Sequence, residues 1–364
     1  MSTRFQAVQW NKAKRVYDGA LLSAVVLYLG LFVSWGWWAD RPGDLPGWID
    51  LGIKAFGTCA FLMLTLILSI GPLARLNRRF LPLLYNRRHF GVLTFVVALL
   101  HAALVASWFQ VQGKLPDLIA ELTSNPLYGS FINFPIKALG LAALTILFLL
   151  AATSHDYWMA FLTPPVWKRL HMALYVAYGL LVMHVALGVM QHDRSPAIPI
   201  LLGGAFVWVA LLHLVVGWRE RATDLGIPGG ADGWISVGPA LSIPDKGARI
   251  VAAVGGERIA VFRDGDRIGA VTNLCAHQNG PLGEGRIIDG CITCPWHGYQ
   301  YRLEDGCAPP PFTERLATFR VRMRDGMVEV DPRPLPPGTR AAIDLAPRSP
   351  IAAKNVDDAG PPRA

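Results

Sequence analysis

Two short stretches of the chain each pair a thiol with an imidazole. Cys275 is followed by His277, and Cys294 is followed by His297, with sixteen residues between the two pairs. Two thiolates can hold one iron of a [2Fe–2S] cluster while two neutral imidazoles hold the other iron. Imidazoles in place of two thiolates make the centre less negative and raise its reduction potential. These four residues therefore predict a [2Fe–2S] electron-transfer centre.

A zinc site is the alternative for the same cysteine-rich segment. Its ligands would be Cys291, Cys294, Cys275 and His297, because Cys-x-x-Cys spacing is common in zinc sites. Zinc does not need the Cys-Pro-Trp-His-Gly loop that begins at Cys294, however, so we favour the iron–sulfur cluster. Cys291 and Cys307 are then expected to be structural thiols.

The segment from Cys275 to Tyr301 closely resembles the Rieske family. The shared pattern is C-x-H-x(16)-C-P-W-H-G, followed by an Asp-Gly turn and a run of prolines, and the resemblance covers residues 233–331. Tyr299 stands where high-potential members of that family have a serine that donates a hydrogen bond to a cluster sulfur. Because fewer donors to sulfur lower the reduction potential, we expect a ferredoxin-like cluster near the lower end of the Rieske range.

Three further histidines, His101, His171 and His184, lie inside long apolar segments. An ionisable residue in a membrane span is costly and marks a functional site, and imidazole is a common axial ligand of haem. His101 lies about 18 Å and His184 about 24 Å from the inner ends of their helices, so these two match best in depth. His171 needs another inner partner, either His89 or His213. Thirteen helical residues rotate by about 140°, so His171 and His184 face one core only if their helix bends.

The segments Arg87–His101 and Val166–His184 resemble the ferric-reductase-like transmembrane family, which includes the haem-bearing membrane subunit of a periplasmic methionine sulfoxide reductase system. The shared features are a basic pair and a glycine before a mid-helix histidine, a Trp-x-x-Leu-His helix entry, and a second histidine thirteen residues on. The resemblance covers residues 20–215. It implies six membrane helices, b-type haem bound through His101, His171 and His184, and electron transfer across the membrane.

The composition indicates a membrane part that carries these histidines. The 364 residues are 52% hydrophobic and 16% charged, with a mean hydropathy of +0.35, whereas soluble domains average about 25% charged residues. These values exclude an ordinary soluble enzyme, a disordered protein and a coiled coil. A membrane helix needs about 20 apolar residues, and the sequence predicts six, at residues 19–38, 53–74, 90–111, 136–154, 170–190 and 197–217.

The formal net charge of +8 marks membrane topology rather than a nucleic-acid partner, because much of the excess flanks the apolar runs. The N-terminal segment, the loop from Arg75 to Arg88, and the loop with Lys168 and Arg169 are basic, and the opposite loops are poor in lysine and arginine. The positive-inside rule then places both termini and the polar half in the cytoplasm. We expect a multi-pass protein of the cell inner membrane.

Four parts follow one another along the chain. They are a six-helix membrane domain at 1–218, a linker at 219–232, a Rieske domain at 233–332 and a disordered tail at 333–364. Short alternating runs such as RIAVFR and RIGAVT, separated by Asp-Gly turns, predict a small β domain, and the tail has no periodic apolar face. The predicted fold class is a membrane all-α six-helix bundle followed by a small all-β domain.

These features predict an oxidoreductase component that passes electrons between a cytoplasmic [2Fe–2S] cluster and transmembrane haem b, with no catalytic residue of its own. The expected donor is a cytoplasmic NAD(P)H-linked reductase or ferredoxin, and the expected acceptor is a periplasmic redox protein or quinone. A Rieske oxygenase would need a further iron held by two histidines and a carboxylate, but no histidine follows His297. The alternative is a redox-sensing or scaffolding membrane protein that carries the cluster.

Overall fold

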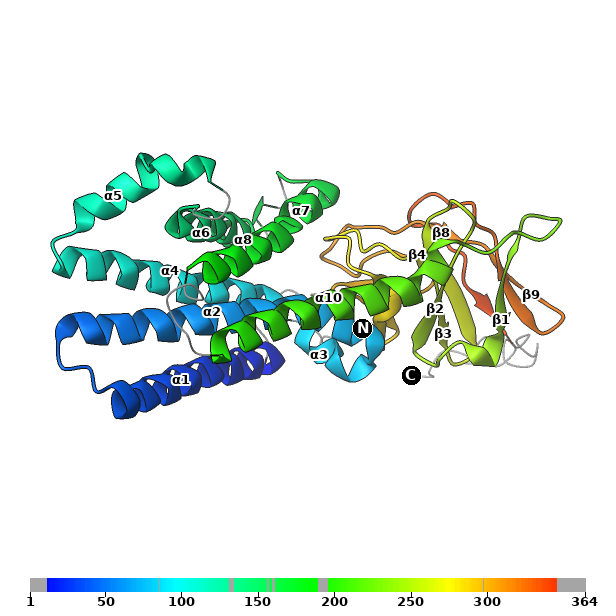
Figure 1. The fold of residues 1–364 in the computed structure, drawn as a ribbon. Helices are drawn as coiled ribbons and strands as arrows, with labels where there is room; N and C mark the ends of the chain where they lie inside the picture. Colours follow the sequence, from blue (N-terminus) through cyan, green and yellow to red (C-terminus); the bar gives the residue numbers. More distant parts are fainter. Residues whose placement is uncertain are drawn as a thin grey trace, which may run out of the picture. The chain divides into compact units, whose positions relative to one another are not determined.

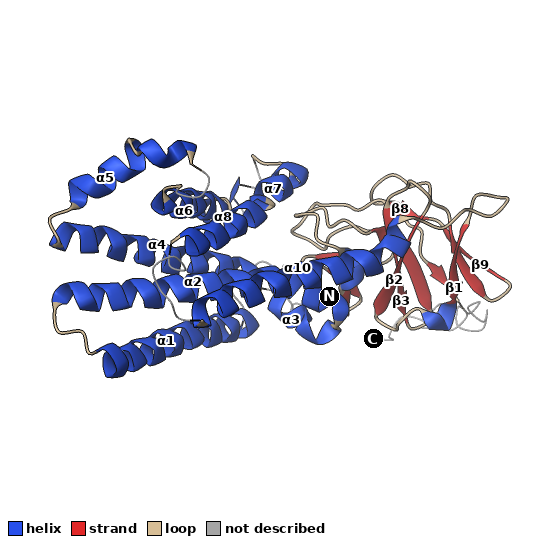
Figure 2. Cartoon of the chain, viewed as in Figure 1, coloured by secondary structure: helices blue, strands red, loops and turns tan. Residues whose placement is uncertain are grey.

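The computed structural model describes residues 12–84, 86–130, 134–155, 157–158, 161–188, 196–296 and 298–345. The chain divides between Arg219 and Glu220 into a helical unit and a β-sheet unit, which Figures 1 and 2 show as ribbons. This division confirms the predicted fold class, an α-helical membrane part followed by a β-sheet domain.

Apolar helices make up the membrane part. Among the described residues, five helical spans are long and apolar enough to cross a bilayer, and α6 is a shorter apolar helix of 17 residues. A helix satisfies its own backbone hydrogen bonds, so these segments need no water inside a membrane. The bounds are α1 Lys12–Asp40, α2 Leu45–Leu76, α3 Leu81–Leu84, α4 Arg87–Val111, α5 Leu115–Thr123, α6 Ile136–Ala152, α7 Pro164–His171, α8 Ala173–Leu187 and α10 Ala197–Asp224.

Helices α2, α4, α6 and α8 form the centre of the helical unit, where α2 packs on α4, α4 on α6, α6 on α8, and α8 on α2. α2 is the most enclosed of the long helices, and Leu64 in its middle is fully buried. α10 also contacts α2, because the indole nitrogen of Trp208 donates a hydrogen bond to the Ser69 hydroxyl at 3.1 Å. The outward-facing side chains, such as Leu31 and Leu214, are apolar and exposed, as expected of a surface in contact with lipid tails.

Two helices differ in detail from the sequence prediction. The span expected at 170–190 is interrupted at Met172, between α7 and α8. α10 continues to Asp224 and so includes the first residues of the predicted linker. Its last turn is held by Arg258, whose guanidinium forms ion pairs with Glu220 and Asp224, all within the β-sheet unit.

The described residues of the β-sheet unit form three antiparallel sheets. Their strand orders are β1-β10-β9, then β11-β4-β3-β2 with β8 also paired to β4, and β5-β6-β7. The strands are β1 Ile235–Pro239, β2 Gly247–Ala252, β3 Arg258–Asp264, β4 Arg267–Thr272, β5 Arg286–Ile288, β6 Cys291–Thr293, β7 Gln300–Arg302, β8 Thr318–Phe319, β9 Val321–Arg324, β10 Met327–Val330 and β11 Ile343–Asp344.

Two buried clusters stabilise this unit. Phe319 and Val330 belong to the first cluster, which is made of aliphatic side chains around one aromatic ring. The second cluster contains Phe262 and Tyr301 together with residues of both cysteine-containing loops. The two predicted thiol ligands, Cys275 and Cys294, are therefore held by the core of the unit.

The prediction that disorder begins at residue 333 is wrong for residues 333–345. Strand β11 pairs with β4, and Ile343 and Leu345 pack against the first buried cluster. The backbone N–H groups of Leu335 and Ala341 also donate hydrogen bonds to Thr318 and Glu304. The composition of residues 333–345 did not predict this ordered structure. The segment adds its apolar side chains to a sheet and a buried cluster that other residues form, so it needs no apolar face of its own. Residues 346–364 lie outside the described residues.

Candidate metal centres

The first predicted ligand loop lies between β4 and β5 and is closed by its own backbone. The Cys275 N–H donates to the Gly280 carbonyl at 2.9 Å, and the Asn279 N–H donates to the Cys275 carbonyl at 2.7 Å. Asn279 has a φ of 55°, a left-handed conformation that asparagine tolerates better than most residues. The loop therefore presents Cys275 and His277 from a rigid turn.

The second ligand loop, between β6 and β7, repeats the same hydrogen-bond pattern. The Cys294 N–H donates to the Tyr299 carbonyl at 2.8 Å, and the Gly298 N–H donates to the Cys294 carbonyl at 2.9 Å. Gly298 has a φ of 73° and occupies the position of Asn279 in the first loop. His297 itself lies outside the described residues, so its role as a ligand stays a prediction.

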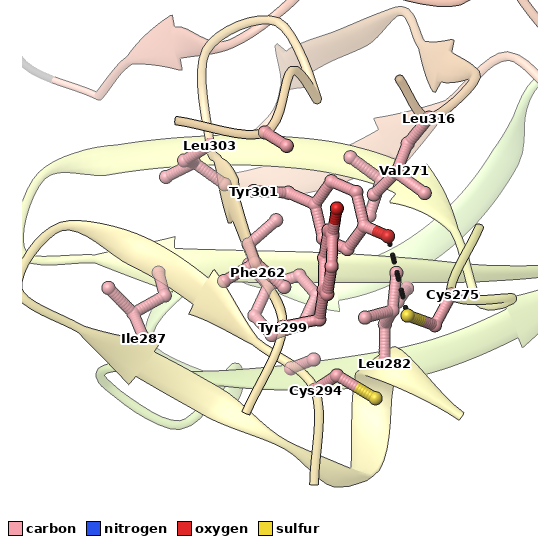
Figure 3. Packing of buried hydrophobic residues seen from close by; sticks show 14 residues of the cluster. Phe262, Val271, Cys275, Leu282, Ile287, Cys294, Tyr299, Tyr301, Leu303 and Leu316 are labelled. Atoms are coloured by element: carbon pink, nitrogen blue, oxygen red, sulfur yellow. Dashed lines mark hydrogen bonds between the residues drawn. The ribbon is translucent and has the colours of Figure 1, made fainter. Parts of the chain in front are cut away.

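The thiols of Cys275 and Cys294 lie in the buried cluster shown in Figure 3. Burial alone raises the pKa of the Cys275 thiol, but hydrogen bonds from Cys294 and Tyr301 outweigh it and lower the pKa to about 6. Because the thiolate is the form that binds metals, this environment prepares Cys275 for iron. The two sulfurs come from different loops and are suited to hold one metal ion between them.

The imidazole of His277 is oriented by a neighbouring aromatic ring. Its ring stacks on Tyr299 with 4.9 Å between centroids and 12° between planes. The Tyr299 hydroxyl donates a hydrogen bond to the Glu314 carboxylate, and burial together with this carboxylate raises the pKa of the tyrosine. Tyr299 thus stays protonated and serves as a fixed surface for His277.

Tyr301 is a candidate functional residue that the sequence motifs do not indicate. Its fully buried hydroxyl lies 3.4 Å from the Cys275 sulfur (Figure 3), and it donates a hydrogen bond when that sulfur is a thiolate. The sequence signal was a second tyrosine two residues after Tyr299. This donor acts on a ligand sulfur, whereas the expectation of fewer donors concerns a cluster sulfur at the position of Tyr299 and stays a prediction.

We expect Tyr301→Phe to lower the reduction potential of the cluster by roughly 40 mV, since a hydrogen bond is worth about 1 kcal/mol. The bond stabilises the more negative reduced state, and its loss favours the oxidised state. A redox titration followed by EPR measures the shift. Tyr128→Phe is the control, because it removes a tyrosine hydroxyl from the helical unit and should leave the reduction potential of the cluster unchanged.

Gly280 has no side chain, which makes room for the Cys294 sulfur beside it. A Cβ atom at this position would lie 2.8 Å from the Cys294 sulfur and 3.1 Å from the Trp296 ring. We expect Gly280→Ala to reduce cluster content by about tenfold, the lower end of the effect of changes beside a metal ligand. Iron and sulfide analysis measures it. Gly230→Ala is the control, because its nearest contact is 3.4 Å; equal losses in both variants would contradict this role.

The zinc alternative receives no support from the described residues. Among them, no three His, Cys, Asp or Glu side chains gather as metal ligands, although the zinc site would require Cys275, Cys291 and Cys294 together. No disulfide joins any of the five cysteines, all of which lie among the described residues, and Cys291 and Cys307 are only partly buried. Cys275, His277 and Cys294 do not gather in this way either, so the preference for two thiols and two imidazoles rests on the motifs of the two loops.

In the helical unit, His101 on α4 and His184 on α8 lie side by side. Their ring centroids are 6.5 Å apart, and their planes are inclined at 86°. The Nδ1 atoms hydrogen-bond to backbone carbonyls, of Ile53 at 3.0 Å for His101 and of Ile136 at 2.7 Å for His184. A carbonyl acceptor at Nδ1 places the proton there and leaves Nε2 free to bind a metal.

This spacing would suit two imidazoles that hold one metal ion between them. A metal–imidazole bond is about 2 Å, so two such bonds and the two ring radii place the centroids roughly 6 Å apart. The sequence prediction that His101 and His184 match in depth agrees with this juxtaposition.

His171 is not part of this pair. Its ring stacks on Trp167 at 3.8 Å, its Nδ1 hydrogen-bonds to the Trp167 carbonyl, and its buried Nε2 has no hydrogen-bond partner among the described residues. Of its two predicted inner partners, His89 pairs with Asp18 and His213 with the Tyr175 hydroxyl. The helix that carries His171 and His184 is interrupted at Met172, but His171 still packs on Trp167 and not beside His101 and His184.

Comparison with protein families gives two separate matches. Residues 233–320 match the Rieske [2Fe-2S] domain. Residues 55–182 match the ferric reductase like transmembrane component. The two matches correspond to the β-sheet unit and to the central helices of the helical unit.

Individual relatives show the same division. The chain is 42% identical over 84 residues to the anthranilate 1,2-dioxygenase ferredoxin subunit of Burkholderia cepacia, covering 22% of this chain and 76% of the relative. It is 28% identical over 202 residues to the protein-methionine-sulfoxide reductase heme-binding subunit MsrQ of Caulobacter vibrioides, covering 54% and 88%. It is 38% identical over 87 residues to chlorophyllide a oxygenase of Oryza sativa, covering 22% of this chain but only 16% of the oxygenase.

Among solved structures, the chain is similar to one from a complex of oxygenase and ferredoxin in carbazole 1,9a-dioxygenase. The sequence identity is 31%, the match covers 29% of this chain and 97% of that chain, and the TM-score is 0.27.

Proposed function

Since residues 233–320 belong to the Rieske [2Fe–2S] family and residues 55–182 form a ferric-reductase-like transmembrane domain, we propose that this membrane protein transfers electrons between a cluster and b-type haem. The observation that carries the proposal is that one chain contains two preorganised sites. One is the pair of twin loops around Cys275 and Cys294, and the other is the facing pair His101 and His184.

The protein's part in this function is to hold and tune the two groups. Cys275 and Cys294 hold one iron of the cluster, and His277 and His297 hold the other. Tyr301 stabilises added negative charge at the Cys275 sulfur. Both groups supply one-electron chemistry, while the protein sets their position, potential and exposure to solvent.

His101 and His184 hold the haem between α4 and α8, each fixed by a backbone carbonyl. His171 is the third proposed ligand, and its buried Nε2 is available for a second metal centre nearer the inner face. The basic loops support an orientation in which the Rieske domain and the end of the helices near His171 lie on the cytoplasmic side.

The proposed electron path runs from the cytoplasm outward. A cytoplasmic NAD(P)H-linked reductase or ferredoxin would supply electrons to the unit that holds Cys275 and Cys294, and a periplasmic redox protein or quinone would accept them from the part of the membrane unit that holds His101 and His184. The names of the relatives support each end, since one is a ferredoxin subunit and another is a heme-binding reductase subunit. The proposal includes a location in the cell inner membrane.

Absorption and EPR spectra of one purified sample test the proposal. We expect b-haem absorption bands and, after reduction, a Rieske EPR signal in the same chain. A sample with the Rieske signal and no haem would contradict electron transfer through the membrane. That result would favour the alternative, a redox-sensing or scaffolding membrane protein.

A further inference from the structure

The central helices of the membrane part form two equivalent pairs, α2 with α4 and α6 with α8. Ile53 and His101 lie 48 residues apart and share a carbonyl–imidazole hydrogen bond, and Ile136 and His184 share the same bond at the same separation. Each residue of the second pair lies 83 positions after its counterpart in the first. The two halves therefore repeat one arrangement of helix, carbonyl and histidine.

Buried residues of the first helix pair also have buried counterparts 83 positions later in the second pair. Three further pairs of equivalent positions are buried in both halves: Leu64 and Leu147, Ala60 and Ala143, and Thr94 and Ala177. The repeat thus extends beyond the histidines into the packing that positions them.

A glycine stands against each histidine at the equivalent place. A Cβ at Gly57 would lie 2.9 Å from the Nδ1 atom of His101, and a Cβ at Gly140 would lie 3.0 Å from the Cε1 atom of His184. Each glycine comes four residues after the isoleucine whose carbonyl accepts the imidazole hydrogen bond. Each ring is therefore confined by a glycine and a carbonyl of the same helix.

We propose that Gly57 and Gly140, with the carbonyls of Ile53 and Ile136, are positioning groups that hold the two ligand rings nearly perpendicular. The observed angle between the rings is 86°. This inference rests on the proposed function, in which His101 and His184 bind haem. Perpendicular axial imidazoles make the two iron d orbitals that interact with them nearly equal in energy, so a low-spin ferric haem gives a highly anisotropic EPR signal. Parallel rings give an ordinary rhombic signal instead.

The first test needs no variant. We expect the wild-type ferric protein to show the highly anisotropic low-spin signal. A purely rhombic signal would overturn the positioning proposal while leaving the proposed function intact. A wild-type protein with no haem at all would overturn both.

The second test compares Gly57→Ala and Gly140→Ala with Gly91→Ala on α4 and Gly179→Ala on α8. A Cβ atom at either control glycine would meet no other side chain or neighbouring helix within 4 Å. Alanine is a better helix former than glycine, so any loss of haem in the first two variants arises from the contact with the ring. We expect their haem content to fall by about tenfold, or the haem that remains to lose the anisotropic signal, with both controls unchanged.

The Rieske EPR signal of the same sample provides the reference for the amount of protein, because the cluster loops belong to the β-sheet unit and the variants to the helical unit. Haem is therefore expressed per cluster, and only membrane-inserted protein is compared. Wild-type haem content and an unchanged EPR signal in both Gly57→Ala and Gly140→Ala would overturn the proposal. Equal haem loss in the two control variants would overturn it as well.

Discussion

Replacing His101 or His184 by alanine is expected to remove the haem while leaving the iron–sulfur cluster in place. The two rings lie 6.5 Å apart, and each has its Nδ1 atom engaged by a backbone carbonyl. Alanine provides no ligand atom and leaves one side of the metal open. Changes beside a metal ligand already reduce affinity by about 10–100-fold, so loss of the ligand itself should exceed that range.

Haem is measured by the absorption of its pyridine complex and expressed per Rieske cluster. His155→Ala is the matched control, because this histidine is exposed and its Nδ1 accepts a hydrogen bond from the Tyr157 backbone N–H. It should retain full haem. If His101→Ala and His184→Ala retain as much haem as His155→Ala, this pair does not hold it.

Cys294→Ser is expected to have the opposite effect, with loss of the cluster and retention of the haem. The Cys294 sulfur is buried, comes from the second loop and lies against Gly280. Serine fits the space but supplies a poor ligand for iron, so the cluster loses one of its two thiolates. The EPR signal of the reduced cluster should disappear.

Cys291→Ser is the control for this change, because Cys291 lies three residues earlier and is only partly buried. It should keep the cluster. The zinc alternative predicts instead that Cys291→Ser also loses its metal, so metal analysis of the two variants separates the two centres. A Cys294→Ser protein with an unchanged Rieske signal would contradict the ligand assignment.

Features that depend on local pattern could be predicted from the sequence. Long charge-free runs predicted the membrane helices, because a bilayer demands continuous apolar helix. Helical rise alone predicted that His101 and His184 would match in depth, and they lie together. The C-x-H and C-P-W-H-G motifs predicted the two loops, because their turns need glycine and proline at fixed positions.

Features that depend on contacts between distant segments were missed. The hydroxyl of Tyr301 reaches Cys275 across 26 residues of chain, and no local pattern indicates which buried tyrosine will do so. Residues 333–345 are ordered because they complete the edge beside β4, which their own composition does not show. Gly57 and Gly140 resemble ordinary membrane-helix glycines until the histidine rings are placed against them.

The central claim is that the cluster exchanges electrons with the haem of the same chain. Anaerobic reduction with NADH and a ferredoxin reductase tests it most directly, with the cluster followed by EPR and the haem by absorption in wild type and Cys294→Ser. We predict that wild-type haem is reduced after the cluster. In Cys294→Ser the haem should stay oxidised until dithionite is added. Wild-type haem that remains oxidised beside a reduced cluster, or Cys294→Ser haem reduced at the wild-type rate, would contradict the claim.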